Sequence, residues 1–190
     1  MSPLEILAVA CGLTNIALLV RRSIWNFPFG IAMVALYAVI FYRTRLYGEA
    51  GLQVFFAAVQ VYGWVLWSRA GGRAEAVAVH WLGWPARLGW VAFIVIATLA
   101  LGTLMQRLTD AALPYPDAAI TAASIAAQFL LSFRRIENWL LWIAIDAGAI
   151  AVYIERDLHL TAALYVALLV LSVLGLREWM KAGRGREIEA

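Results

Sequence analysis

Seven long apolar segments, separated by short polar joints, follow one another along almost the whole of this 190-residue chain. A helix needs about 20 mostly apolar residues to cross the roughly 30 Å of hydrocarbon in a bilayer. Lipid offers no partner for backbone N–H and C=O groups, so such segments fold as helices. The chain is therefore expected to be an all-α polytopic membrane protein, with spans at residues 3–20, 24–42, 49–68, 88–106, 115–133, 138–154 and 160–179.

The composition excludes several classes of protein. Hydrophobic residues make up 64% of the chain and charged residues 14%, whereas soluble domains have about 45–50% and about 25%. The net charge of +3 comes from basic residues scattered between apolar runs, which is not the pattern of a nucleic-acid surface. The lone Cys11 forms no intrachain disulfide, and His80 and His159 are too far apart to suggest a metal site. Phosphate-loop, HExxH and nucleophile-elbow motifs are absent, so we expect no ATP drive, no metal and no cofactor.

The distribution of Lys and Arg predicts the orientation. Seven spans put the two termini on opposite sides of the membrane, and cytoplasmic loops are enriched in basic residues. Eleven of the fifteen basic residues fall on the side of the C-terminus, which we expect to be cytoplasmic, with the N-terminus outside. The eleven are Arg21, Arg22, Arg69, Arg73, Arg87, Arg134, Arg135, Arg177, Lys181, Arg184 and Arg186. The start of the chain lacks the basic region of a cleaved signal peptide, so the first segment is read as a permanent span.

The two ends of the chain align when it is shifted by 112 residues. Asn26-Phe27 then falls on Asn138-Trp139, Gly63 on Gly175 and Trp67 on Trp179, in register with the apolar runs. Each copy holds three spans, and the span left over between them makes the copies parallel. Parallel repeats around an axis along the membrane normal are one plan of transporters, with the substrate site at their interface. We therefore expect a first three-helix bundle at 1–69, a loop and linker helix at 70–112, a second bundle at 113–182 and a cytoplasmic tail at 183–190.

Polar and aromatic residues form a stripe on the third span. Gln53, Phe56, Gln60, Trp64 and Trp67 are spaced 3, 4, 4 and 3 residues apart, which places them on one helix face. Two amides and two indoles on one face suit a flat, polar, uncharged ligand. Hydrogen bonding between helices and packing of the indoles explain the same pattern.

A second stripe lies on the sixth span, where Trp139, Trp142, Asp146 and Tyr153 share a face. An acidic residue near the bilayer centre costs at least about 2.5–3.5 kcal/mol, so Asp146 is expected to face the bundle interior. A structural hydrogen bond to backbone or to a tyrosine is favoured for it over direct handling of substrate or protons. At the start of the same span, Glu137 is a candidate for helix capping or an inner gate.

Two further expectations concern single residues. Gln128 is a candidate ligand contact on the fifth span. Pro28 falls inside the predicted second span and predicts a bend there, because proline frees a backbone carbonyl in the preceding turn.

These residues resemble the PnuC-type vitamin transporters. The resemblance rests on Glu137-Asn138-Trp139 through Trp142 and Asp146, on Tyr153, the segment 158–165 and Trp179, and on the pattern from Gln53 to Trp67. It implies two three-helix bundles joined by a linker helix, as in the related sugar carriers, and a homotrimer in the bacterial inner membrane. It also implies facilitated diffusion of nicotinamide riboside, which cytoplasmic phosphorylation then traps. The ligand contacts that it implies are Trp25, Asn26, Gln53, Gln60, Trp64, Gln128, Glu137, Asn138, Trp139 and Trp142.

The residue chemistry agrees with such a ligand. Tryptophan faces attract a flat cationic pyridinium ring, and Gln and Asn side chains can both donate to and accept from ribose hydroxyls. Two alternatives stay open: a carrier for thiamine or another aromatic vitamin, and a protein of another class, an intramembrane enzyme or assembly factor that uses Asp146. The latter lacks a second ionisable group near Asp146, which acid–base chemistry usually needs.

Overall fold

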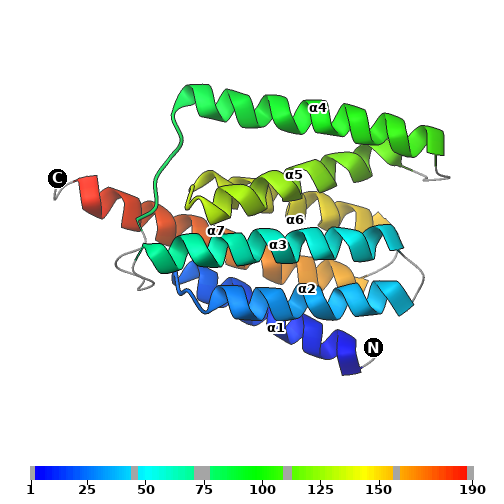
Figure 1. Ribbon diagram of the computed structural model, residues 1–190, viewed down its shortest axis with the longest axis horizontal. Coiled ribbons are helices and arrows are strands. Elements are labelled where there is room, and N and C mark those ends of the chain that lie inside the picture. The colour runs from blue at the N-terminus through cyan, green and yellow to red at the C-terminus, as the bar shows by residue number, and fades with distance from the viewer. Residues whose placement is uncertain (1–2, 44–46, 71–77, 109–112, 156–158, 188–190) are drawn as a thin grey trace.

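The computed structural model describes residues 3–43, 47–70, 78–108, 113–155 and 159–187, and seven helices account for most of them (Figure 1). Each predicted span is a helix with ends close to those expected, except that the last continues well past residue 179. The helices are α1 Pro3–Val20, α2 Asn26–Arg43, α3 Tyr47–Arg69, α4 Trp84–Leu108, α5 Pro114–Ser132, α6 Glu137–Glu155 and α7 His159–Glu187.

Six of the helices close into a ring. Among the described residues, α1 packs against α2, α2 against α3, α3 against α5, α5 against α6, α6 against α7, and α7 back against α1. The remaining helix, α4, lies outside the ring and packs mainly on α5 (Figure 1). This arrangement is the predicted one, with two three-helix bundles joined by a linker helix.

The helices α5 and α6 place small or polar residues inside the protein. Within the part of the chain that the structure describes, α1 to α4 and α7 are long and apolar enough to cross a membrane by length and hydropathy. In α5, the side chains of Ala118, Ala122 and Ala126 are wholly buried, so small residues allow the close packing of a membrane helix with its neighbours. In α6, Glu137 and Asp146 are buried inside the protein and therefore do not contact lipid.

The repeat predicted from the shift of 112 residues is present in detail. Arg22 and Arg134, which align, both have positive φ, at 55° and 59°. In the same turns, the Asn26 amide donates to the Ser23 carbonyl and the Asn138 amide donates to the Arg135 carbonyl, each at 2.6 Å. The turns that lead into α2 and α6 are therefore built alike, which relates the two bundles by internal symmetry.

The first turn of α2 corrects one expectation. The helix begins at Asn26, so Pro28 lies in its first turn. A missing N–H costs little there, because the first backbone donors of a helix have no partner within it. The physical reason for expecting a bend at Pro28 therefore does not apply.

A cluster of large apolar side chains fills the ring near the end at which α7 terminates. Trp67 packs edge-to-face on Phe27, with ring centroids 5.2 Å apart, and Trp179 packs edge-to-face on the equivalent Trp139 at 5.6 Å. We call this cluster the aromatic plug. Its buried members are Leu19, Phe27, Trp67, Val79, Leu131, Ile136, Trp139 and Trp179.

Gly175 gives a direct test of this packing. A Cβ at Gly175 would overlap the indole ring of Trp139, whereas a Cβ at Gly148 on α6 would meet nothing within 4 Å. We expect Gly175→Ala to lower the free energy of unfolding by about 1–3 kcal/mol, the usual effect of overpacking. The control Gly148→Ala should be neutral or stabilising by up to about 1 kcal/mol, since alanine favours helix. Thermal unfolding in detergent measures both, and equal midpoints would contradict the packing.

Candidate functional site

The ring encloses a cavity of about 320 Å³. Every helix of the ring contributes to its lining, whereas the outer helix α4 contributes nothing. Leu19, Leu131 and Trp139 belong both to the lining and to the aromatic plug, so the plug borders the cavity on the side where α7 terminates. The interface between the two repeats is where a parallel-repeat carrier binds its substrate, and this cavity lies at that interface.

The structure brings five of the ten candidate ligand contacts to this cavity. These five are Asn26, Gln60, Gln128, Trp139 and Trp142. The other five are Trp25, Gln53, Trp64, Glu137 and Asn138, and none of them lines it. Ligand contact by any of the ten remains a prediction.

The five candidates that do not line the cavity lie in different surroundings. Trp25 and Trp64 are 64% and 39% exposed on the outside of the ring. The Asn138 amide donates to the Arg135 carbonyl in the turn before α6, as the Asn26 amide does to the Ser23 carbonyl, but only Asn26 also lines the cavity. Gln53 lies two turns before Gln60 on α3 and outside the cavity. The stripe predicted on α3 is thus divided, and only Gln60 of it reaches the cavity.

The wall formed by the first bundle is polar. Asn15 on α1 donates from its side-chain amide to the Asn26 carbonyl at 2.8 Å. A Cβ at Gly30 would overlap the amides of both Asn15 and Gln60, so the glycine makes room for them. Gln60 is 5% exposed, and its amide forms no hydrogen bond with the residues that the structure describes. Asn15 was missed in the sequence, because it belongs to no polar stripe along the first apolar run.

The wall formed by the second bundle combines an aromatic ring, an amide and an acid. Trp142 lines the cavity at the position that Gly30 occupies in the first bundle. Gln128 is 8% exposed, and among the described residues its side chain has no hydrogen-bond partner. Ser172 donates from Oγ to Oδ2 of Asp146 at 3.0 Å.

Asp146 therefore has a serine as its partner, where the sequence suggested backbone or a tyrosine. The hydrogen bond joins α6 to α7. The tyrosine of the predicted stripe, Tyr153, has a side chain outside the described part of the structure. In the sequence, Ser172 gave no signal of its own, because serines in apolar helices usually bond to their own backbone.

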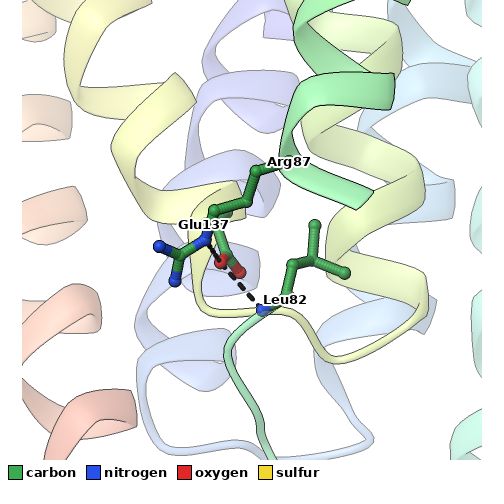
Figure 2. A network of polar contacts seen from close by, with 3 residues as sticks. All are labelled: Leu82, Arg87 and Glu137. Atoms are coloured by element: carbon green, nitrogen blue, oxygen red, sulfur yellow. Dashed lines mark hydrogen bonds and ion pairs between the residues drawn. The ribbon is translucent and has the colours of Figure 1, made fainter. Parts of the chain in front are cut away.

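Glu137 is buried but lies apart from the cavity, at the start of α6. Its Oε1 accepts from the Leu82 backbone N–H at 2.8 Å and pairs with Nε of Arg87 at 2.9 Å (Figure 2). The chain before α4 also pairs with the turn between α5 and α6, since the His80 N–H donates to the Arg134 carbonyl and the Ile136 N–H to the His80 carbonyl. Glu137 thus fastens the linker to the second bundle.

Comparison with known proteins adds independent observations. The profile of the family described as nicotinamide mononucleotide transporter matches residues 2–181. The nicotinamide riboside transporter PnuC of Escherichia coli K12 is 29% identical over 98% of this chain and 88% of its own length. The riboflavin/roseoflavin transporter RibM of Streptomyces davaonensis is 28% identical over 91% of this chain and 82% of its own. The crystal structure of the vitamin B3 transporter PnuC is 29% identical and superposes with a TM-score of 0.77 over 95% of this chain and 82% of that one.

The profile covers nearly the whole chain, the solved relative shares its fold, and the cavity lies at the interface of the repeats. All these relatives are transporters and none is an enzyme. This chain therefore belongs to the PnuC, or nicotinamide mononucleotide transporter, family of multi-pass membrane transporters.

Proposed function

We propose that this protein carries nicotinamide riboside across the bacterial inner membrane by facilitated diffusion. The observation that carries the proposal is the cavity lining, in which an indole ring and two buried amides without partners among the described residues face one space. The indole of Trp142 suits the flat pyridinium ring. The amides of Gln60 and Gln128 can donate to and accept from the hydroxyls of ribose and the carboxamide.

The description of the family names nicotinamide mononucleotide, which carries a phosphate. The charges of the cavity lining instead support nicotinamide riboside, which carries none. The described lining contains no Lys, Arg or His, and its one acidic side chain is Asp146. Phosphate sites depend on basic side chains or on free backbone N–H groups at helix starts. A buried phosphate beside a carboxylate would have neither a counter-ion nor a favourable field, so a phosphorylated ligand is disfavoured.

Riboflavin is the second candidate, because one of the relatives is a riboflavin/roseoflavin transporter. The volume of about 320 Å³ is at the small end of the range of roughly 300–1,000 Å³ usual for ligand sites. A single pyridinium ring with its ribose fits a cavity of this size better than the three fused rings of a flavin. Cavity volume therefore supports the riboside.

Transport would proceed by rocking one bundle against the other around the cavity. We place the C-terminus in the cytoplasm and the N-terminus in the periplasm, since Arg21, Arg22, Arg134 and Arg135 lie in turns at the end where α7 terminates. The aromatic plug would then be closed toward the cytoplasm, and cytoplasmic phosphorylation would trap the product. We divide the chain into bundles at 1–69 and 113–182, a linker at 70–112 and a tail at 183–190; the first boundaries lie near the end of α3 and the start of α5, whereas α7 continues to Glu187, into the proposed tail.

The proposal also includes the assembly of three copies of the chain into a homotrimer. The outer helix α4 has a largely exposed apolar surface, with Val91, Ile96 and Leu99 more than half exposed. Such a surface can face lipid or a second copy of the chain. The mass of the purified complex in detergent, corrected for bound detergent, measures the number of copies.

Uptake into proteoliposomes tests the transport proposal. We expect vesicles with the purified chain to accumulate labelled nicotinamide riboside down its gradient until the two sides are equal, without any added ion gradient. Unlabelled nicotinamide riboside should compete, and nicotinamide mononucleotide should not. Uptake that requires a proton or sodium gradient would reject facilitated diffusion. Riboflavin uptake with no riboside uptake would reject the substrate.

A further inference from the structure

We infer that Asp146 selects the substrate by charge: its carboxylate pairs with the positive charge of the ligand's aromatic ring. This inference rests on the proposed function and extends it to a residue outside the ten candidate ligand contacts. Asp146 is 5% exposed and lines the cavity. The side chain therefore faces the ligand space and not the lipid.

The carboxylate is only half satisfied by the protein. Ser172 donates to Oδ2 at 3.0 Å, and no described residue donates to Oδ1. The ion pairs described lie elsewhere, between Arg87 and Glu137 and between Lys181 and Glu178. A buried carboxylate without a cation is costly unless a partner arrives with the ligand. A cationic ligand would supply that partner.

The neighbour on the same helix supports this assignment. Trp142 precedes Asp146 by one helical turn, and both side chains line the cavity. An indole face attracts a cationic ring through its π electrons, and a carboxylate next to it adds a full opposite charge. Indole and carboxylate together therefore form a site for a flat aromatic cation.

The internal repeat shows that the indole of Trp142 and the carboxylate of Asp146 have no counterparts in the first bundle. The first-bundle equivalents of Trp142, Asp146 and Ser172 are Gly30, Val34 and Gln60. The first bundle thus offers amides and no charge, and the second offers the ring and the acid. The ligand would be oriented across the interface, with its cationic ring against α6 and its hydroxyls toward Asn15 and Gln60.

The test compares nicotinamide riboside with its dihydro form, which has the same ribose and carboxamide but an uncharged ring. Binding to the purified full-length chain is measured by calorimetry, and competition by uptake. We expect the unmodified protein to bind the cationic form at least about tenfold more tightly. In Asp146→Asn this ratio should fall to the smaller preference that the Trp142 ring alone provides, mainly through loss of affinity for the cation. The ratio within each protein is independent of the fraction that is folded.

Two further variants separate the possible outcomes. Ser172→Ala keeps the carboxylate and should keep the preference for the cation, and Glu178→Gln, which removes an exposed charge, should leave both affinities unchanged. Equal affinity of the unmodified protein for the two forms, or an unchanged ratio in Asp146→Asn, would overturn the role of Asp146 while transport of the riboside stands. Failure of the unmodified protein to bind either form would instead reject the proposed function.

Discussion

Replacement of Trp139 by alanine is expected to abolish riboside uptake and to lower the free energy of unfolding by about 3–5 kcal/mol, the usual effect of truncating a buried large aromatic residue. Trp139 is 1% exposed, and its ring packs edge-to-face on Trp179. It also lines the cavity, so it belongs both to the plug and to the ligand site. Truncation would therefore open a void between the two. Thermal unfolding in detergent and uptake into proteoliposomes measure the two effects.

Trp64→Ala is the matched control. Trp64 lies on α3, is 39% exposed and does not line the cavity, although its position in the predicted stripe made it an equal candidate. We expect this variant to unfold near the temperature of the unmodified protein and to keep its uptake. The same loss of uptake in both variants, with both folded, would show that the binding site lies elsewhere.

The sequence predicts the architecture well because lipid restricts the choices. Spans can be located by apolar length alone, and the 112-residue shift predicts which helices correspond. The shift aligns Gly63 with Gly175, and in the structure each of these glycines contacts the aromatic ring at position 27 or 139. The same glycine–aromatic contact in both bundles requires similar residues at equivalent positions, and these residues are what the alignment of the sequence with itself detects.

Helix faces are harder to predict, because apolar side chains point both to lipid and to the protein core. Trp64 and Trp67 are three residues apart, yet Trp67 is wholly buried and Trp64 is exposed. In a soluble helix, the apolar face points to the core and the polar face to water. A membrane helix lacks this contrast, because the faces toward lipid and toward the core are both apolar. For the same reason Gln60 and Gln53 were equal candidates, and only the ring of helices separates them.

The hydrogen-bond partners of the buried polar side chains also could not be predicted from the sequence. The spacing of α6 shows that Asp146 and Trp142 share a face, but not that Ser172 of α7 lies opposite. The same applies to Glu137, whose partners on Leu82 and Arg87 come from the segment that joins the bundles. Such contacts depend on how helices are rotated against one another, which a single sequence does not specify.

The two cavity glutamines give a prediction with opposite signs for binding and stability. Gln60→Leu and Gln128→Leu are each expected to weaken riboside binding by about 1–3 kcal/mol, or about 5- to 150-fold, because a polar group of the bound ligand would lose its partner. Neither amide bonds to the described protein, so the free energy of unfolding should stay the same or rise. Calorimetry and thermal unfolding of the same samples separate the two quantities.

Gln53→Leu is the matched control for these variants, since it removes a half-buried amide from α3 outside the cavity and should leave affinity unchanged. Gln60 and Gln128 come from different bundles, so they should contact different groups of the ligand. Their effects on affinity should then add in the double variant to within about 0.5 kcal/mol. A lower unfolding temperature with unchanged affinity in both single variants would mean that the amides hold helices together. Loss of affinity at constant stability would assign the two amides to ligand binding. An amide that stabilises the fold would lower the unfolding temperature when it is removed, whereas an amide that contacts only the ligand would not.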